Sequence, residues 1–487
     1  MTLLDRIDHW GRTAPARTAH LSDDRVLTYG ELLAQSDTLA AWLDAELGDS
    51  RMPIAVHGHK EPEMLVSFLA AVKSGRPYVP IDYTTPPQRM ERIVEIARAG
   101  LVLTPEKVAG ITAAGAVNYQ RKPLGKDDPF YILFTSGSTG EPKGVVITLG
   151  NLNHYLAWMG GAHPFREQGE VFLNQAPFTF DLSVHDIYLT LSMGNTMFSI
   201  TKAHANNLPA LFAALRRCDA TMWMSTPSFA QMCMIERGFS AAMIPRMSRF
   251  FLAGEALAPE TVLQLLERFP AAQVWNAYGP TESTVAVTAL NVTREIVAQW
   301  NPLPIGHVMT GSRIVIRGED GKAVPPGERG EIVIAGPSVS PGYLGRPDLT
   351  EKAFYPLDDT RAYRTGDWGR DRDGMIFYEG RMDSQIKLYG NRIELGDLEA
   401  NLRALPEVAD AVVLPVTKRG AIDSLAAFIV LSVSQQGTDF EQAARLKRHL
   451  GERLPAYMVP RKFHFLDSFP MNNNGKADRK KLAEMLK

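Results

Sequence analysis

The stretch with the densest chemistry is residues 135–144, Thr-Ser-Gly-Ser-Thr-Gly-Glu-Pro-Lys-Gly, where three glycines and four hydroxyl side chains fall within ten residues. Glycines let backbone N–H groups turn toward one anion, and the hydroxyls and Lys143 add donors and positive charge. A Gly/Ser-rich loop can also be a plain surface hairpin. This density favours a cradle for a polyphosphate. It is not a Walker A loop, because GxxxxGK[ST] is absent and a β-branched run at 145–147 predicts a strand after it.

A carboxylate in an apolar setting is a second candidate for chemistry. Asp181 follows Phe178-Thr179-Phe180. There it could bind a substrate ammonium group, or it could simply cap the helix that follows. His185 lies four positions later on the same helical face, a spacing that also suits a buried core histidine. The chain shows no Ser–His–Asp or Cys–His arrangement and no CxxC or HxxxH pattern, so a catalytic triad and a zinc site are not expected.

Three further stretches carry residues that suit a nucleotide. In residues 276–282, Tyr278 could stack on a base and Glu282 could bind a metal, although Gly-Pro there also predicts a turn that ends a strand. Asp367 could accept both hydroxyls of a ribose, or it could form an Asx turn. Lys476 stands on a polar loop eleven residues from the last residue, where most lysines are only solvated charge.

The elements that position these residues alternate between helices and short apolar strands. Strands are expected at 53–56, 78–81, 101–104, 130–134, 145–147, 171–174, 221–224, 250–253 and 274–278, and helices at 3–13, 29–43, 64–73, 87–98, 182–194, 208–217 and 259–269. Such alternation predicts an α/β fold with a parallel, doubly wound sheet. Ligands gather at the carboxyl ends of such strands, where Thr135, Asp181, Ala253 and Tyr278 are placed.

The last third of the chain has a different pattern of predicted elements. From about Pro304, short strands at 313–317 and 331–335 separated by turns predict a small barrel or curled sheet. After residue 382 a β-rich piece and a helix at 440–450 predict one small α+β domain. We therefore expect two domains, 1–382 and 383–487.

Composition narrows the class of protein. A net charge of −2 over 487 residues gives no support for nucleic-acid or anionic-membrane binding. The two cysteines, Cys218 and Cys233, lie in apolar helical surroundings and are expected to be free buried thiols in a reducing cytosol. Acids at residues 1–8 do not fit a signal peptide, and no stretch approaches the roughly eighteen apolar residues of a membrane span. We expect a cytoplasmic monomer.

Taken together and in this order, these stretches resemble the adenylate-forming superfamily of acyl- and aryl-CoA synthetases, amino-acid adenylation domains and luciferases. The similarity covers essentially the whole chain. The motifs concerned are the phosphate loop (135–144), the adenine and magnesium motif (276–282), the ribose motif (363–367), the hinge (380–387) and the catalytic-lysine motif (474–476). The resemblance implies a large N-terminal domain of two doubly wound sheets plus a small distorted β-barrel, followed by a small α+β lid domain.

The resemblance also implies roles for individual residues. The catalytic residue would be Lys476, the hinge Asp383, and the Mg²⁺ ligands Glu282 and Thr139. The ATP site would comprise Thr135, Ser136, Gly137, Ser138, Thr139, Gly140, Lys143, Asn276, Ala277, Tyr278, Gly279, Pro280, Thr281, Asp367, Tyr378, Arg381 and Lys476. The amino-acid site would comprise Asp181, Leu182, His185, Phe251, Ala253, Val285 and Lys476.

Within the superfamily, Asp181 marks enzymes that act on α-amino acids, because it stands where they bind the α-ammonium group. Longer runs resemble the branch that loads D-alanine onto a carrier protein: 172–178, 180–184, 225–229 and 455–463. The departures lie in the pocket, where Ala253 replaces a cysteine, His185 an apolar residue and Ala277 a threonine. They favour "a small α-amino acid" over D-alanine in particular.

The expected reaction has two halves. The amino acid's carboxylate attacks the α-phosphate of ATP, and the thiol of a phosphopantetheine then takes the aminoacyl group. No carrier domain follows Lys476, so a separate carrier protein is expected. Three alternatives stay open: an enzyme loading an L-amino acid in natural-product biosynthesis, an acyl- or aryl-CoA ligase or luciferase-like enzyme, and a non-catalytic nucleotide sensor. Asp181 argues against the second, and Glu282, Asp367 and Lys476 argue against the third.

Overall fold

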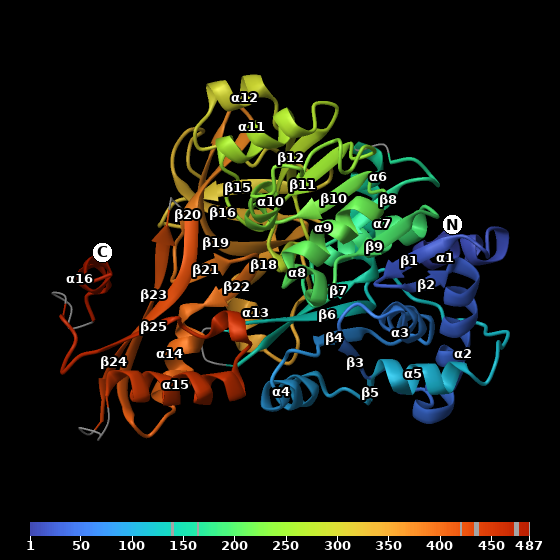
Figure 1. The fold of residues 1–487 in the computed structure, drawn as a ribbon, viewed down its shortest axis with the longest axis horizontal. Coiled ribbons are helices and arrows are strands. Elements are labelled where there is room, and N and C mark those ends of the chain that lie inside the picture. The colour runs from blue at the N-terminus through green and yellow to red at the C-terminus, as the bar shows by residue number, and fades with distance from the viewer. Residues whose placement is uncertain (138–140, 163–164, 419–420, 433–437, 472–476, 487) are drawn as a thin grey trace. The chain divides into compact units, whose positions relative to one another are not determined.

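The computed structural model describes residues 1–487 except 138–140, 163–164, 419–420, 433–437, 472–476 and 487 (Figure 1). The chain forms two compact units. The first consists of Met1–Asp82, Ile96–Leu133 and Gly144–Met382, and the second of Tyr83–Glu95, Phe134–Lys143 and Asp383–Lys487. Asp383, the expected hinge, is the first residue of the long segment of the second unit.

A nine-stranded sheet is the largest element of the first unit. Its strands, in spatial order, are β14 (His307–Val308), β13 (Thr288–Asn291), β12 (Gln273–Tyr278), β11 (Arg249–Leu252), β10 (Met222–Ser225), β8 (Val171–Asn174), β9 (Thr196–Ser199), β1 (Thr18–Ser22) and β2 (Arg25–Thr28). The strands from β12 to β1 run parallel, and antiparallel pairs close both edges. Parallel neighbours β11 and β12 therefore end at one edge, which places Ala253 and Tyr278 near each other.

A second sheet of six strands has the same parallel character at its centre. Its order is β17 (Gly342–Tyr343), β7 (Lys143–Thr148), β6 (Pro129–Thr135), β4 (Tyr78–Asp82), β3 (Ile54–Gly58) and β5 (Leu101–Leu103). The pairs β3–β4, β3–β5 and β4–β6 are parallel. The expected α/β fold with two doubly wound sheets is thus present.

Helices connect these strands. They are α1 (Leu3–Thr13), α2 (Tyr29–Leu47), α3 (Pro62–Lys73), α4 (Pro87–Ala97), α5 (Pro105–Thr112), α6 (Leu149–Ala162), α7 (Leu182–Ser192), α8 (Lys202–Ala205), α9 (Leu208–Arg217), α10 (Pro227–Met234), α11 (Pro259–Arg268), α12 (Arg294–Gln299) and α13 (Pro347–Ala353). Every residue of α3 and of α7 is buried. Helices buried on all sides expose no residue to water, so the polar side chains of α3 and α7 must find partners inside the protein.

An antiparallel sheet follows the change in sequence pattern at about Pro304. Its strands are β15 (Arg313–Arg317), β16 (Gly330–Ala335), β19 (Thr360–Arg372), β18 (Phe354–Leu357) and β20 (Met375–Arg381), which pairs with β19. A β-bulge between Asp367 and Gly369 interrupts the β19–β20 pair. Bulges re-aim side chains, and this one occurs at the expected ribose-binding aspartate.

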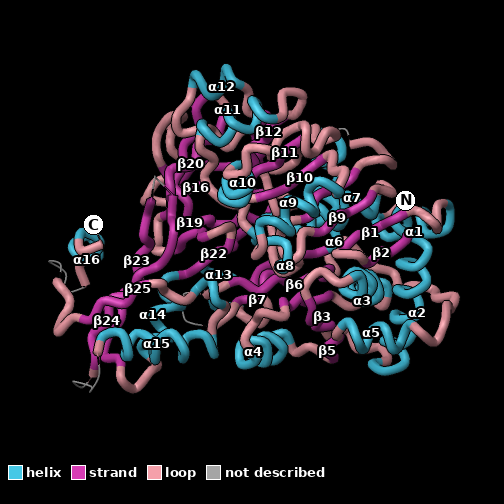
Figure 2. The backbone as a smooth tube through the Cα atoms, in the orientation of Figure 1, coloured by secondary structure: helices cyan, strands magenta, loops and turns pink. Residues whose placement is uncertain are grey.

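The second unit is α+β, as expected (Figure 2). It contains the hairpin β21 (Gln385–Leu388)–β22 (Asn391–Glu394), the sheet β23 (Val408–Lys418)–β24 (Ala421–Leu431)–β25 (Lys462–Phe465), and the helices α14 (Leu395–Arg403), α15 (Asp439–Arg453) and α16 (Arg479–Glu484). A core of Leu398, Leu402, Ile429 and Leu446 joins α14 and α15 to this sheet. None of the helices in the described chain is long and apolar enough to cross a membrane.

Both cysteines are buried free thiols, as expected. Burial raises the pKa of Cys218 to about 11 and that of Cys233 to about 12. Because the thiolate is the reactive form, neither side chain is a nucleophile at neutral pH.

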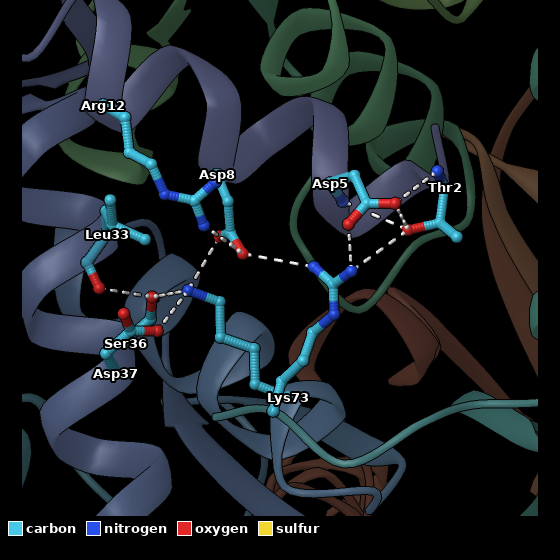
Figure 3. A network of polar contacts seen from close by, with 9 residues as sticks. Thr2, Asp5, Asp8, Arg12, Leu33, Ser36, Asp37 and Lys73 are labelled. Carbon is cyan, nitrogen blue, oxygen red and sulfur yellow. Dashed lines mark hydrogen bonds and ion pairs between the residues drawn. The ribbon is translucent and has the colours of Figure 1, made fainter. Parts of the chain in front are cut away.

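A buried cation joins the first three long helices (Figure 3). Lys73, at the end of α3, is 1% exposed, and its ammonium lies 2.9 Å from the Asp8 carboxylate and 2.7 Å from that of Asp37. It also donates to Ser36 Oγ at 2.9 Å. The three N–H groups of Lys73 thus meet acceptors from α1 and α2.

Candidate active site

The expected phosphate loop lies between two strands. β6 ends at Thr135 and β7 begins at Lys143, while Ser138, Thr139 and Gly140 lie outside the described residues. The element after the loop is therefore a strand, as predicted. A Cβ atom on Gly137 would lie 2.2 Å from the backbone oxygen of Glu141. Glycine is required there because the loop passes too close to itself for any side chain.

Two hydroxyls at the start of this loop have different surroundings. The buried Oγ1 of Thr135 has no hydrogen-bond partner among the described residues. Ser136 Oγ donates to the backbone oxygen of Arg392 at 2.9 Å and accepts from the backbone N–H of Glu394 at 3.1 Å. Leaving a buried hydroxyl unsatisfied is unfavourable. Thr135 therefore fits a site where an anion's oxygen supplies the missing partner.

Asp181 is placed by the turn between β8 and α7. It occupies the N-cap position of α7, but its side chain makes no capping hydrogen bond. Instead its carboxylate, 4% exposed, accepts a 2.7 Å hydrogen bond from Thr281 Oγ1. The capping alternative therefore does not describe this side chain. The carboxylate is directed to the turn at 279–282, and Phe178 and Leu182 are buried beside it in the sequence.

Beyond Asp181, the same face of α7 packs against aromatic side chains from other elements. His185 is fully buried, and its Nδ1 lies 2.7 Å from the hydroxyl of Tyr155 on α6. Its ring centre is 5.6 Å from that of Phe251 on β11, and those of Phe165 and Phe172 are each 6.3 Å away. His185 is therefore a core histidine with a hydrogen-bond partner, and the structure brings it to Phe251.

The turn after β12 forms a tight contact with itself. A Cβ on Gly279 would lie 2.6 Å from Ala286 Cα and 2.9 Å from the backbone oxygen of Val285. Val285 itself has a φ of 68°, and Thr284 before it a φ of 62°. A β-branched residue with positive φ is strained, and such strain collects at functional sites. Val285, expected in the amino-acid site, thus stands on a backbone held in an unusual shape.

The nucleotide candidates of the first unit converge from three strands. The Tyr278 hydroxyl donates to Asp367 Oδ2 at 2.5 Å, and Arg381 Nη1 donates to Asp367 Oδ1 at 2.9 Å and to the Thr365 oxygen at 2.6 Å. The ring centres of Tyr278 and Tyr378 are 6.1 Å apart. Burial, with the Asp367 carboxylate next in effect, raises the pKa of Tyr278 well above its usual range. The phenol therefore stays a donor.

Glu282 is the candidate metal ligand that the structure describes. It is fully buried in the short 3-10 turn Thr281–Ser283, and its Oε1 accepts a 2.8 Å hydrogen bond from the Tyr343 hydroxyl. The described residues contain no group of three or more potential ligands, and Thr139 lies outside them. Mg²⁺ keeps several waters and binds through one or two carboxylates plus phosphates. A single buried carboxylate fits an ion that arrives with a nucleotide.

Comparison with known families decides the assignment of the chain. Residues 7–344 match the family described as AMP-binding enzyme, and residues 397–476 match the AMP-binding enzyme C-terminal domain. The chain belongs to the AMP-binding enzyme family. The resemblance found in the motifs is confirmed.

This AMP-binding enzyme also has full-length relatives. It is 45% identical over 500 residues to the D-alanine–D-alanyl carrier protein ligase of Bacillus cereus (strain B4264), with 99% of each chain covered. It is 45% identical over 499 residues to the protein of the same name from Bacillus anthracis, again with 99% of each covered.

Solved structures share its fold. The Vibrio cholerae adenylation domain AlmE in complex with glycyl-adenosine-5'-phosphate superposes with a TM-score of 0.86 at 20% identity, covering 99% of this chain and 97% of AlmE. NpsA-ThdA, an artificially fused adenylation–PCP di-domain from Klebsiella oxytoca, gives 0.82 at 25% identity, covering 96% and 94%. The α/β fold class is confirmed.

The predicted catalytic lysine of this AMP-binding enzyme, Lys476, lies outside the described residues. The residues that flank its segment are described: Met471 and Ala477 form an antiparallel bridge. At the expected hinge, Asp383 Oδ1 accepts the backbone N–H of Gln385 at 3.0 Å.

Sequence reasoning missed two tyrosines that contact predicted site residues. Tyr343 binds Glu282 from 61 positions away, and Tyr155 binds His185 from 30 positions away. Neither tyrosine stands in a motif, and both contacts depend on tertiary structure. No signal in the sequence could have found these tyrosines, because only the fold shows which buried aromatic donors lie near an acid or a histidine.

Proposed function

We propose that this enzyme is an ATP-dependent ligase that adenylates D-alanine, or another small α-amino acid, and transfers it to the phosphopantetheine thiol of a separate carrier protein. The shared name of the full-length relatives supports this substrate and partner. The observation that carries the amino-acid part is Asp181, a buried carboxylate that does not cap its own helix and is held by Thr281. A buried carboxylate is a strong partner for an ammonium group.

In the first half-reaction, a carboxylate oxygen of the amino acid attacks the α-phosphorus of ATP, and the bond to pyrophosphate breaks. Both reactants are anions, so the site must align them and neutralise charge. We assign Lys476 to bridge the carboxylate and the α-phosphate. Asp181 holds the ammonium group, and Leu182, His185, Phe251, Ala253 and Val285 enclose the side chain. Residues 135–140 and Lys143 cradle the β- and γ-phosphates.

The nucleoside contacts use the other converging residues. We assign Asp367 to the ribose hydroxyls with help from Arg381, and Tyr278 and Tyr378 to the adenine. The segment 276–281 lines the same site. Glu282 and Thr139 would hold Mg²⁺, which would supply positive charge beside the phosphates and ease the departure of pyrophosphate.

In the second half-reaction, the carrier's thiolate attacks the aminoacyl carbonyl carbon, and AMP leaves. We propose that the domain 383–487 rotates about Asp383 after pyrophosphate departs, so that residues 387–392 replace the Lys476 loop. Lys476→Ala given preformed aminoacyl-adenylate tests this. Thioester formation should stay near the parent rate, and a fall as large as that in adenylation would contradict the two-conformation account.

A second candidate function is loading of an L-amino acid in natural-product biosynthesis. Ala253 and His185 favour it, because they replace a cysteine and an apolar residue expected for D-alanine enzymes. Mass spectrometry of the carrier can decide. Enzyme, MgATP, phosphopantetheinylated carrier and one amino acid at a time should add a D-alanyl group faster than an L-alanyl, glycyl or seryl group. Ala253→Cys and His185→Met, assayed beside the parent, show which residue sets the preference.

We also propose that the enzyme acts as a cytoplasmic monomer, because its reaction consumes ATP and every residue assigned to that reaction comes from one chain. Its near-neutral charge of −2 gives no reason to expect nucleic-acid binding.

A further inference from the structure

A second buried lysine, Lys60, lies in the loop between β3 and α3 and is 1% exposed. Its ammonium donates to three backbone oxygens: Gln175 at 2.8 Å, Asn174 at 3.2 Å and Ile200 at 2.7 Å. These oxygens stand at the carboxyl ends of the parallel neighbours β8 and β9. A lysine that follows a strand of the six-stranded sheet thus binds the carboxyl ends of two strands in the nine-stranded sheet.

The number of acceptors matches the charged form of the side chain. An ammonium has three N–H donors, whereas a neutral amine has two and a lone pair that would face a carbonyl oxygen. Burial lowers the pKa of Lys60 to about 7, an effect that Asp186 and Asp82 oppose and Lys202 reinforces. Three acceptor oxygens around one nitrogen therefore require a protonated Lys60. With a pKa of about 7, however, Lys60 loses part of its proton near neutral pH.

A buried polar chain lies beside these carbonyls. His20 Nε2 donates to Ser199 Oγ at 2.9 Å, and Ser199 Oγ donates to Asn174 Oδ1 at 3.0 Å. Asn174 Nδ2 donates to Asp186 Oδ2 at 2.9 Å. All four side chains are fully buried. Asp186 is on α7, so the chain ties this helix to the same strand end that Lys60 closes.

Both ends of one segment are thus anchored at this place. From Gln175 the chain passes through turns, with Phe180 N–H bonded to the Pro177 oxygen at 2.9 Å, and reaches Asp181. It continues through His185 to Asp186. The segment 175–186 therefore carries the proposed ammonium ligand between Lys60 at one end and Asn174–Asp186 at the other.

We propose that Lys60, as an ammonium, is a positioning residue for amino-acid binding: it fixes the carboxyl end of β8 and thereby the place of Asp181. This inference rests on the proposed function of Asp181. Lys60 is assigned to neither reactant. It acts by holding the backbone that presents the carboxylate, and a displacement of about 1 Å there is enough to reduce turnover severely.

The first test separates amino-acid binding from ATP binding. Lys60→Met should raise the KM for the amino acid in pyrophosphate exchange at least about tenfold, with the KM for ATP changed less than about twofold. Lys73→Met is the matched control, because it also removes a buried lysine but far along α3. It should lower the thermal midpoint without this split. Equal changes in both KM values for Lys60→Met, or none, would overturn the proposal.

The second test does not need activity. Hydrogen exchange of the peptide 175–184, corrected for intrinsic pH dependence, should lose protection in the parent between about pH 6 and pH 8 as Lys60 loses its proton. A peptide from β10 should not. Unchanged protection of 175–184 across that range would contradict the proposal even if Lys60→Met failed to fold. If the parent shows no exchange activity with any amino acid, the proposed function is refuted. The hydrogen-exchange measurement would still test whether Lys60 fixes the end of β8.

Discussion

Thr281 Oγ1 donates a 2.7 Å hydrogen bond to Asp181 Oδ2, although the two residues are 100 positions apart. Asp181 is the proposed amino-acid ligand, and Thr281 belongs to the motif proposed for the nucleotide. One hydroxyl therefore joins the two halves of the site. It aligns the carboxylate before substrate binds, and it makes the position of each motif depend on the other.

Removal of this hydroxyl should affect amino-acid binding. We expect Thr281→Val to raise the KM for the amino acid about tenfold, because the buried carboxylate loses a partner worth about 1.5 kcal/mol. Thr281→Ser keeps the donor and should restore most of the affinity. Steady-state pyrophosphate exchange measures both. If Ser and Val variants behave alike, the hydrogen bond is not what matters at this position.

The Tyr278–Asp367 contact predicts a coupled effect on ATP. Tyr278→Phe keeps the ring and loses the 2.5 Å donor to Asp367, so we expect a rise of a few fold in the KM for ATP. Asp367→Asn should raise the KM for ATP much more, because Arg381 also loses its carboxylate partner. The double variant should be less impaired than the product of the two single effects. Full additivity would show that the phenol does not act through Asp367.

The buried Lys73 predicts a stability effect. Lys73→Met leaves the carboxylates of Asp8 and Asp37 without their shared cation, and loss of one partner of a buried ion pair costs about 3–5 kcal/mol. Arg217→Met is the exposed control: its pair with Asp24 is 49% and 95% exposed, so its loss should change the free energy of unfolding by less than about 1 kcal/mol. Urea unfolding followed by circular dichroism measures both. Equal losses would contradict the assigned role of burial.

Asp397 on α14 predicts a pH dependence of the second unit. Burial raises the pKa of Asp397 to about 6, although Arg89 at 3.7 Å opposes this. The folded state then binds the proton more tightly than the unfolded chain, whose carboxyl has a pKa of about 4. The stability from this group is present at low pH and is lost as pH rises from about 4 to about 6, by up to about 1.4 kcal/mol per pH unit.

Asp397→Asn cannot ionise and should lack this slope. The difference in thermal midpoint between Asn variant and parent should therefore grow from pH 4 to pH 6 and then stay constant. Differential scanning calorimetry at four or five pH values measures it. A parallel pair of curves would show that Asp397 does not titrate in this range.

Much of this fold follows from local pattern. The helix expected at 3–13 is present over Leu3–Thr13, and the helix expected from residue 29 begins there as α2, behind a capping box formed by Thr28 and Glu31. The strand 171–174 and the helix 208–217 also have the expected bounds. These succeed because periodicity and capping act over a few residues.

Contacts between distant residues could not be predicted in the same way. Nothing in the sequence around Lys60 distinguishes it from a solvated lysine. In the fold, however, its ammonium binds the end of a strand more than 100 positions away. Nor did the sequence pattern show whether Asp181 caps its helix. The structure shows that its carboxylate accepts instead from Thr281, which only the fold brings near. The order of the motifs in the sequence identified the family. Which side chains contact one another depends on the tertiary structure.

The central claim is that the site joins an amino acid to AMP through Asp181. Amino-acid-dependent exchange of labelled pyrophosphate into ATP tests it most directly, with parent and Asp181→Asn side by side in the presence of Mg²⁺. We predict D-alanine-dependent exchange in the parent and a loss of at least about a hundredfold in kcat/KM in the variant, because a buried ammonium loses its counter-charge. Exchange that persists undiminished in Asp181→Asn, or is absent from the parent with every amino acid offered, would contradict the account.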